Sequence, residues 1–484
     1  MLFNSIDFAV FLPLVFFLYW FVFQKHLKAQ NALIVIASYT FYGWWDWRFL
    51  SLILFSSIVD YTVGLQLQKT DIPKKRKFLL WVSIVINIGF LGFFKYFDFF
   101  VDNFVNAFSF FGYQIPSTSL NIILPVGISF YTFQTLSYTI DVYKKELKPT
   151  KDFVVFSAFV SFFPQLVAGP IERATNLLPQ FYKQRQFNYK NAVLGLRQIL
   201  WGLFKKIVIA DNCSVIANEI FNNSTSFGGT SLVLGAVMFA FQIYGDFSGY
   251  SDIAIGTSRL FGFNLMKNFA FPYFSRDVAE FWRRWHISLS TWFRDYLYIP
   301  LGGSKGGVLM KVRNTFIIFI ISGFWHGANW TFIVWGFLNA LYFLPLLLRN
   351  KNRVHTGDIA ENSLLPTFKE LRGMMLTFSL TILAWIFFRA ENISHAIQYI
   401  SDLFTGLIDY TNYLETYNLL RDFGPALIVV FIIFILVEWS GRHTEFAINR
   451  LTNNRFLNIF FYYLILFLIF IYSGKPQEFI YFQF

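Results

Sequence analysis

Residues 314–350 read NTFIIFIISGFWHGANWTFIVWGFLNALYFLPLLLRN, an apolar run interrupted near its middle by Gly323, His326 and Gly327. An ionisable side chain in hydrocarbon is costly, so its presence in such a run indicates a function. The glycines let the backbone bend and approach a partner closely. We therefore expect His326 to be a functional residue at membrane depth.

Basic residues flank this run, with Lys311 and Arg313 before it and Arg349 and Lys351 after it. Because Lys and Arg concentrate in cytoplasmic loops, both ends are expected on the cytoplasmic side. The run is too short for two spans of about 20 residues each, so the sequence predicts a short or broken hairpin. His326 would lie at its bend.

The whole chain has the composition of a polytopic membrane protein. Of its 484 residues, 56% are hydrophobic and only 14% are charged, too few charges for a soluble domain. Apolar windows recur from one end to the other, which predicts one integral membrane domain over residues 1–484. We expect an all-α fold of roughly 10 to 12 transmembrane helices with additional re-entrant and interfacial helices.

The formal net charge of +12 comes from basic residues in short loops between the apolar windows, for example residues 74–77 and 144–151. That distribution indicates membrane orientation, so we expect no nucleic-acid partner. The alternation of basic and non-basic loops predicts extracytoplasmic N- and C-termini. It also requires residues 153–168, which have basic flanks on both sides, to be re-entrant.

The single cysteine, Cys213, excludes an intramolecular disulfide. A Cys/His zinc site would have too few candidate ligands, so we expect no metal and regard Cys213 as a small filler residue near a membrane surface. The first apolar window, residues 8–23, has no basic region before it and no small-residue cleavage pattern after it. It is therefore expected to remain as the first span.

A segment rich in arginine and tryptophan precedes the apolar run: residues 277–303 read DVAEFWRRWHISLSTWFRDYLYIPLGG. Its composition is typical of an amphipathic segment at a membrane interface. Arg283, Arg284 and Arg294, together with Trp285, are candidates for binding an anionic donor, because Arg pairs with phosphate through a fork of N–H groups. Simple interfacial anchoring is the alternative.

His286 lies in the same segment. It is either a second titratable group near the chemistry or a structural histidine whose hydrogen bond stabilises the fold. Asp295, next to Arg294, is most simply its ion-pair partner. The sequence Leu301-Gly302-Gly303 allows a sharp reversal of the chain.

Long motifs in this chain resemble those of the membrane-bound O-acyltransferase family. They are FWRRWHISLSTWFRDYLYIPLGG (281–303), FWHGANWTFIVWG (324–336), SFFPQLVAGPI (161–171) and QIYGDFSGYSDIAIG (242–256). Within that family, the length and the extra spans after the core are most similar to the membrane subunit of bacterial alginate O-acetyltransferase and its peptidoglycan-acetylating relatives. The D-alanyl transfer protein of teichoic acid modification is similar but tends to be shorter.

The resemblance implies a family core at about residues 120–350, followed by a C-terminal part at 374–484. It implies that His326 is the catalytic histidine and that His286 is the second histidine of the site. It also implies a multi-pass enzyme of the bacterial inner membrane, with acetyl-CoA as a cytoplasmic donor substrate and no tightly bound cofactor.

The chemistry agrees, because a neutral imidazole can accept the proton of an attacking hydroxyl and burial disfavours its charged form. The alternative is that His326 has a structural role and forms a hydrogen bond where helices pack together.

The C-terminal residues 478–484, EFIYFQF, resemble the tyrosine motif of acyl-relay partners in the family's D-alanylation systems. A phenolic hydroxyl can accept an acyl group and pass it on. Tyr481 is therefore a candidate acyl carrier between His326 and a partner, an extracytoplasmic acetyltransferase of hydrolase fold. The alternative is an aromatic anchor at the outer interface.

We expect an enzyme that moves acetyl groups across the membrane to an extracytoplasmic polysaccharide, alginate-like or peptidoglycan. D-alanyl transfer to teichoic acid is one alternative. Another is a transporter of an anionic or lipid-linked solute, which the absence of a duplicated half weighs against. A scaffold that recruits an extracytoplasmic enzyme is a third.

Overall fold

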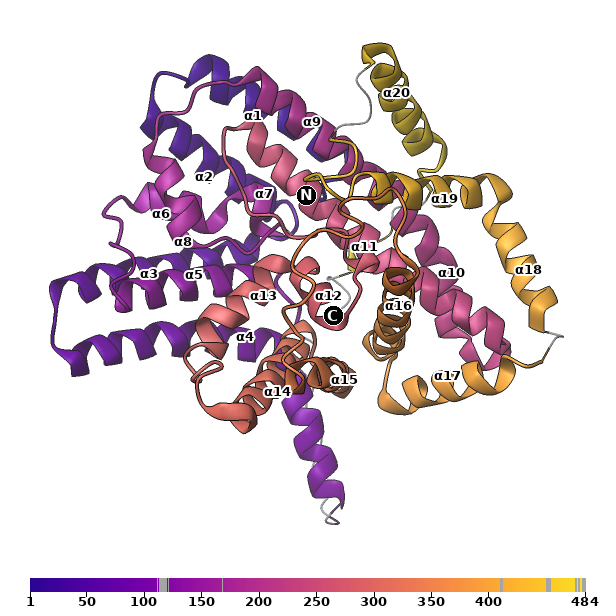
Figure 1. Cartoon of the computed structure of the whole chain (residues 1–484). Helices are drawn as coiled ribbons and strands as arrows, with labels where there is room; N and C mark the ends of the chain where they lie inside the picture. Colours follow the sequence, from indigo (N-terminus) through magenta and orange to yellow (C-terminus); the bar gives the residue numbers. More distant parts are fainter. Residues whose placement is uncertain are drawn as a thin grey trace. The chain divides into compact units, whose positions relative to one another are not determined.

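The computed structural model describes residues 1–110, 112, 120, 122–167, 169–409, 412–449, 454–474, 477, 479 and 480. Every regular element in these ranges is a helix (Figure 1), which confirms the predicted all-α class. The residues group into two compact units. Unit 1 comprises Met1–Gly195 and Thr257–Met266, and unit 2 comprises Leu196–Gly256 and Lys267–Phe484.

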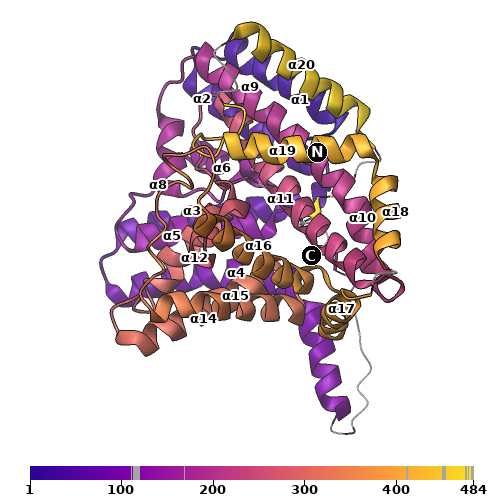
Figure 2. The ribbon, with the colours of Figure 1, turned by 45° about the vertical axis from the view of Figure 1, so that its right-hand side comes forward.

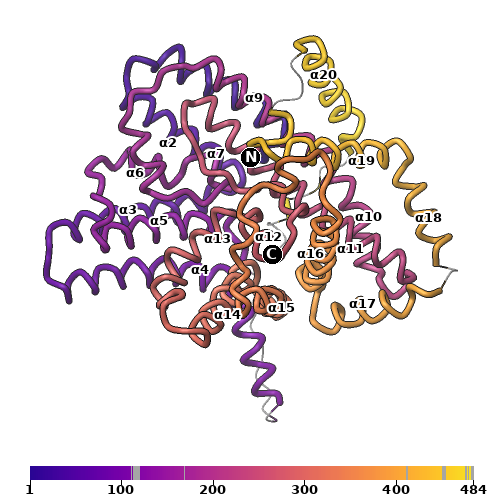
Figure 3. The backbone as a smooth tube through the Cα atoms, viewed as in Figure 1, coloured from indigo at the N-terminus to yellow at the C-terminus, as the bar shows by residue number. Residues whose placement is uncertain are grey.

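In unit 1, helices α3, α4 and α5 pack against one another (Figure 3). Asp60 of α3 is fully buried between them, and it accepts hydrogen bonds from Asn87 of α4 at 2.8 Å and Thr139 of α5 at 3.1 Å. A buried carboxylate is tolerated only when its oxygens are bonded, so this network sets the register of the three helices. The helices of unit 1 are α1 (Ile6–Phe17), α2 (Leu27–Gly43), α3 (Leu50–Lys69), α4 (Pro73–Phe110), α5 (Ile128–Tyr143), α6 (Phe153–Ser161), α7 (Phe163–Leu166) and α8 (Ala174–Leu177).

Two long helices contribute to both units: α9 (Tyr189–Phe204) and α11 (Gly229–Leu260). A π-helical segment, η4 (Lys205–Ala210), continues α9 into α10 (Asp211–Asn222). The other helices of unit 2 are α12 (Val278–Arg284), α13 (Ile287–Phe293), η7 (Arg294–Tyr298), α14 (Gly307–His326), α15 (Trp330–Leu348), α16 (Phe368–Arg389), α17 (Ile393–Gly406), α18 (Asn412–Phe423), α19 (Pro425–Ser440) and α20 (Arg455–Ile471).

Helices α14, α15 and α16 lie side by side in unit 2 (Figure 2). Glycines allow the closest contact between α14 and α15. A Cβ on Gly323 would lie 2.1 Å from the carbonyl oxygen of Phe332, and one on Gly336 would lie 2.3 Å from that of Phe319. Since real Cβ atoms do not approach backbone oxygens so closely, both positions require glycine.

Within the described residues, six helices are long and apolar enough to cross a membrane: Trp47–Lys69, Pro73–Phe110, Gly229–Leu260, Gly307–His326, Trp330–Leu348 and Phe368–Arg389. A seventh span results if α18 and α19, which are bent by 85° to each other, are counted as one broken span. The sequence predicted a larger number. Several apolar windows form helices too short to count, namely Ile6–Val22, Phe153–Leu166 and Arg455–Ile471.

The apolar run at 314–350 is a helical hairpin, as predicted, but its arms are longer than the sequence suggested. Helix α14 begins at Gly307, ahead of the apolar run, and both α14 and α15 reach spanning length. The expectation of a hairpin too short for two spans is therefore wrong. It failed because the first turns of α14 contain Lys311 and Arg313 and do not look apolar.

Residues 153–166 form two short helices, α6 and α7, with a break at Phe162 where the backbone is not helical (ψ 104°). Together they are shorter than a membrane span requires. This agrees with the prediction that the segment does not cross.

Candidate functional site

His326 is the last residue of α14, and Gly327 follows it before α15 begins. Its side chain is buried, with 3% exposed. Three aromatic rings surround the imidazole, at centroid distances of 5.0 Å for Trp325, 5.1 Å for Trp335 and 5.3 Å for Phe388. Aromatic rings therefore pack closely against the imidazole.

His286 lies between α12 and α13 and is also buried, with 1% exposed. The ring of Phe247 meets its ring edge-to-face at 4.6 Å. Burial lowers the pKa of the His286 imidazole from 6.5 to about 3, so the ring is neutral at physiological pH. Its backbone is left-handed, with φ at +44°, which is uncommon for a residue other than glycine.

The fold brings the two predicted catalytic histidines into one aromatic cluster. The Trp325 ring lies 6.1 Å from the ring of His286 and 5.0 Å from that of His326. Both histidines belong to unit 2. The cluster therefore holds two buried imidazoles that both pack near the same indole.

A cavity of about 480 Å³ lies between the α12–α13 segment and the α14–α15 hairpin. Arg283, Arg294 and Arg353 are among the residues that line it. Ser322, another lining residue, is 6% exposed and lies one helical turn before His326 on α14. The apolar residues of its wall include Trp282, Leu289, Phe293, Ile318, Phe319 and Phe343.

Of the four residues predicted to bind the donor, Arg283 and Arg294 line this cavity and Arg284 and Trp285 do not. Arg283 donates to the backbone carbonyls of Asn352 at 2.8 Å and His355 at 2.6 Å, whereas Arg294 is 60% exposed and pairs with its neighbour Asp295 at 2.7 Å.

The two residues outside the cavity belong to the protein interior. Arg284 bonds to the buried Glu280 at 3.0 Å. Trp285 is 1% exposed and stacks on Phe281 at 5.6 Å, so the segment is folded inward and is not an amphipathic helix lying on a surface.

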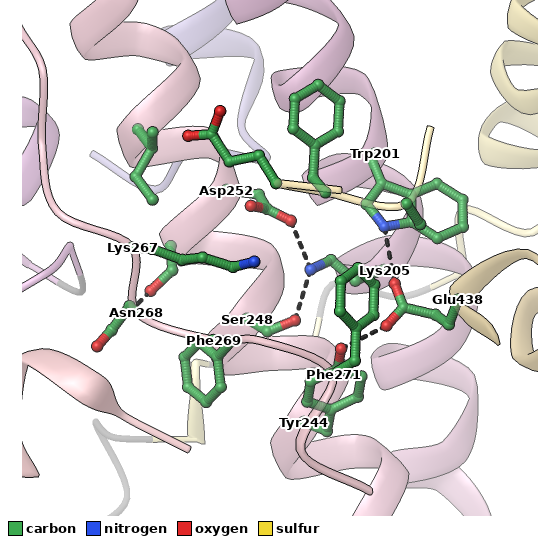
Figure 4. Close-up of a pocket in the computed structure, with 15 residues that line it drawn as sticks. Trp201, Lys205, Tyr244, Ser248, Asp252, Lys267, Asn268, Phe269, Phe271 and Glu438 are labelled. Atoms are coloured by element: carbon green, nitrogen blue, oxygen red, sulfur yellow. Dashed lines mark hydrogen bonds and ion pairs between the residues drawn. The ribbon is translucent and has the colours of Figure 1, made fainter. Parts of the chain in front are cut away.

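A second, polar pocket lies against α11 and has a volume of about 20 Å³, enough for about one water molecule (Figure 4). Lys205 lies in it, with its ammonium 2.6 Å from the carboxylate of Asp252. Glu438 accepts a hydrogen bond from the indole N–H of Trp201 at 3.0 Å. Asn268, which contacts His286, also lines this pocket.

The described residues of the C-terminal tail are buried in unit 2. Phe479 is 0% exposed and packs on Tyr250 at 4.4 Å and on Phe247 at 6.2 Å. Phe247 is the ring that also meets His286. The tail thus enters the protein interior next to the histidine cluster, whereas the anchoring alternative placed it at a membrane interface. Tyr481 itself lies outside the described residues.

A buried ion cluster clamps the backbone of this tail. The Lys206 ammonium lies 2.7 Å from Asp211, 2.8 Å from Asp246 and 3.2 Å from the carbonyl oxygen of Gln477. Asp246 also accepts a hydrogen bond from the backbone N–H of Ile480 at 2.7 Å. The cluster therefore recognises main-chain atoms on both sides of Phe479.

Sequence reasoning missed the lysines of η4 and their partners. The available signal was the pair Lys205 and Lys206 inside an apolar window, because intramembrane charges indicate functional or structural sites. Asn268 has no comparable signal, since asparagine is common in loops. Cys213, expected near a membrane surface, is fully buried.

Comparisons with known proteins identify the family of this chain. The model of the MBOAT, membrane-bound O-acyltransferase, family matches residues 144–387. A protein of Azotobacter vinelandii named probable alginate O-acetylase AlgI is 39% identical over 84% of this chain and 78% of its own length.

Two further relatives have related names. The peptidoglycan O-acetyltransferase of Helicobacter pylori is 37% identical over 82% of this chain and 79% of its own length. The teichoic acid D-alanyltransferase of Streptococcus thermophilus is 30% identical over 54% of this chain and 68% of its own length. The chain therefore belongs to the membrane-bound O-acyltransferase family and is a multi-pass membrane O-acyltransferase.

Proposed function

We propose that this enzyme takes an acetyl group from acetyl-CoA on the cytoplasmic side of the bacterial inner membrane and passes it across for O-acetylation of a polysaccharide. The observation that carries the proposal is the cluster of two buried histidines, together with an arginine-lined cavity that reaches Ser322, one helical turn from His326. The names of the similar alginate and peptidoglycan acetylating proteins support acetyl as the group and an alginate-like polymer or peptidoglycan as the acceptor.

His326 acts as the general base in this proposal. The phenol oxygen of Tyr481, the first acceptor in this proposal, attacks the thioester carbonyl carbon, a C–O bond forms and the C–S bond breaks. The hydroxyl proton passes to the imidazole and from there to the leaving thiolate. A neutral imidazole suits this step, because it can accept the hydroxyl proton. His286 supplies a second hydrogen-bonding group.

The arginine-lined cavity binds the donor. Arg283 and Arg294, with Arg353, offer guanidinium groups suited to the phosphates of acetyl-CoA. The apolar wall toward Ser322 suits the thioester arm, because Ser322 is close to His326 along α14. Arg284 and Trp285 support the fold of this segment and do not contact the donor.

Tyr481 carries the acyl group in transit from the histidine cluster to a partner acetyltransferase of hydrolase fold on the extracytoplasmic side. Support comes from the tail itself, because Phe479 is buried beside Phe247, a ring that contacts His286, and Ile480 is buried as well. Asp246 accepts a hydrogen bond from the backbone N–H of Ile480, the residue that precedes Tyr481 in the sequence. Extracytoplasmic termini, as the loop charges indicate, fit delivery on that side.

Similarity to a D-alanyltransferase favours D-alanyl transfer to teichoic acid as a second candidate. That similarity covers 54% of this chain, whereas the similarity to the alginate O-acetylase covers 84%. The transferred group distinguishes the two, since acetyl and D-alanyl differ in mass and in charge.

Purified protein in lipid vesicles, incubated with acetyl-CoA labelled in the acetyl group, tests the proposed function. We expect label to appear on the protein, and mass spectrometry to identify an acetyl ester. If neither the protein nor an added polysaccharide takes up label from acetyl-CoA, acetyl transfer is contradicted, and label from a D-alanyl donor would instead favour the second candidate.

Replacing Arg294 by alanine is expected to raise the KM for acetyl-CoA by roughly tenfold with little change in kcat, because one charge-assisted contact with phosphate is lost. Arg421 is a matched control, since it is also 60% exposed and also pairs with the following aspartate, at 3.3 Å. Arg421→Ala should leave the KM unchanged. Equal effects of the two substitutions would show that general surface charge, and not a donor site, governs the KM.

A further inference from the structure

Asn268 lies in the segment between α11 and α12 and is fully buried. Its side-chain oxygen accepts hydrogen bonds from the backbone N–H of Ser288 at 3.3 Å and from the Ser288 hydroxyl at 2.9 Å, and lies 3.1 Å from Nδ1 of His286. Its side-chain nitrogen donates to the hydroxyl of Ser251 on α11 at 3.0 Å. The amide group is therefore held from both ends.

These bonds determine which ring nitrogen of His286 carries the proton. A backbone N–H can only donate, so the amide atom that meets Ser288 must be the oxygen of Asn268. The Ser288 hydroxyl, 3.5 Å from Nδ1 of His286, gives its proton to the same oxygen, so Nδ1 at 3.1 Å from that oxygen must also be a donor. In the neutral ring the lone pair is left on Nε2, which has no hydrogen-bond partner among the residues that the structure describes.

Asn268 also supports the unusual backbone at this position. His286 has left-handed φ and ψ of 44° and 56°, a conformation that costs free energy for a residue with a Cβ. The backbone carbonyl of Asn268 accepts the N–H of Ile287 at 2.9 Å, next to the contacts with His286 and Ser288. One asparagine thus bonds to three consecutive residues of the strained turn.

We propose that Asn268 is the positioning residue of His286, holding its ring as the Nδ1–H tautomer so that Nε2 serves as a hydrogen-bond acceptor toward an O–H or N–H group of the substrate. This inference rests on the proposed function for the identity of the substrate. Without Asn268 the neutral ring can exchange tautomers, and an Nε2–H would present a donor where the substrate also presents a donor.

The groups around His286 are few enough for the pH dependence of its protonation to be interpreted. The rings that face it, those of Phe247, Phe269 and Trp325, carry no charge. The charged groups closest to its partner are those lining the polar pocket that Asn268 also lines: Lys205, Asp252, Lys267, Glu438 and Glu445.

Nitrogen-15 NMR of full-length protein labelled at histidine tests the tautomer directly. The chain has only six histidines, and His286→Gln assigns the signal by its loss. At neutral pH we expect His286 to show a protonated Nδ1 and an unprotonated Nε2. In Asn268→Leu this pattern should give way to a mixture of both tautomers. A wild-type ring protonated at Nε2, or an unchanged spectrum in Asn268→Leu, overturns the inference.

Acetyl-transfer kinetics give a second readout. Asn268→Leu should slow transfer on the order of tenfold or more, with the affinity for acetyl-CoA unchanged because Asn268 does not line the donor cavity. Asn268→Asp keeps an oxygen for the Nδ1–H group and adds a charge that raises the pKa of His286. The acid limb of the pH profile should then move to higher pH, which a purely structural asparagine would not cause.

Asn339→Leu is the matched control. Asn339 is also a buried asparagine of unit 2, 5% exposed, and donates to the carbonyl of Trp335 within its own helix at 2.8 Å. It should behave like wild type. If wild-type protein transfers no acetyl, the proposed function fails and the NMR result still decides the tautomer. If wild type transfers acetyl and Asn268→Leu does so at the same rate, or Asn268→Asp keeps the wild-type pH profile, the inference fails.

Discussion

Replacing His326 by alanine is expected to abolish acetyl transfer while the protein remains folded and membrane-inserted. The imidazole is the proposed base, and removal of a general base typically costs 10²- to 10⁴-fold in rate, roughly. The rings of Trp325, Trp335 and Phe388 contact it and remain to hold the hairpin. The measurement is transfer of labelled acetyl in reconstituted vesicles, together with thermal unfolding and binding of acetyl-CoA.

His326→Gln is a useful companion variant, because it keeps most of the side-chain volume but cannot act as a base. His26→Ala is the control, since His26 is exposed and lies just before α2 in unit 1. Loss in both position-326 variants with normal donor binding would support the base. Normal acetylation in either of them would exclude it.

Replacing Tyr481 by phenylalanine is expected to reduce acetylation of the polysaccharide to background. Phenylalanine keeps the ring of the aromatic tail but lacks the hydroxyl that would carry the acyl group. Stable label on the protein should disappear as well, since no acyl ester can form at this position. Mass spectrometry of the C-terminal peptide, before and after incubation with acetyl-CoA, measures the ester directly.

Tyr463→Phe is the control for this substitution, because Tyr463 on α20 is 69% exposed. It should retain full transfer. Unimpaired acetylation in Tyr481→Phe rules out the carrier and would leave direct transfer from the histidine cluster to an external acceptor. Loss of polysaccharide acetylation with persistent label at another residue would place the carrier elsewhere in the chain.

The π-helical segment η4 connects the two parts of the site. Lys205 points to the pocket that Asn268 lines, and Lys206 points to the clamp on the tail, although the two residues are adjacent. Both are buried, with 3% and 1% exposed. Single π-turns occur often at functional sites, where they alter the direction of successive side chains. Here the π-turn follows the C-terminal end of α9 and holds both Lys205, in the pocket that Asn268 lines, and Lys206, which bonds to the tail.

Patterns of residue type were enough to predict the fold class and to name candidate site residues. Apolar windows, few charges and basic loops predicted an all-α polytopic fold, because hydrocarbon accepts little else. The sequence pointed to His326 because an ionisable imidazole in an apolar run is costly and therefore indicates a function. Among the described residues, fewer helices reach spanning length than the 10 to 12 expected, since apolar windows can also form short helices, as in α6 and α7.

Such patterns could not identify residues whose role depends on their neighbours in the folded structure. Arg283 and Arg284 are adjacent and identical in type, yet one lines the cavity and the other bonds to Glu280 inside unit 2. The direction in which each side chain leaves the helix decides which of the two lines the cavity. Residue type alone does not specify that direction. Asp246 and Lys206 lie far apart in the chain, so their contact with the tail follows only from packing.

The sequence by itself determined that this is a helical membrane O-acyltransferase with a histidine at the apex of an apolar hairpin, because local hydrophobicity and motif residues encode both. Only the tertiary structure decided that His286 faces the same indole as His326, that Asn268 sets its tautomer and that the tail is buried beside them. These facts depend on long-range packing and on the geometry of single hydrogen bonds. Neither is recorded in the order of residues along the chain.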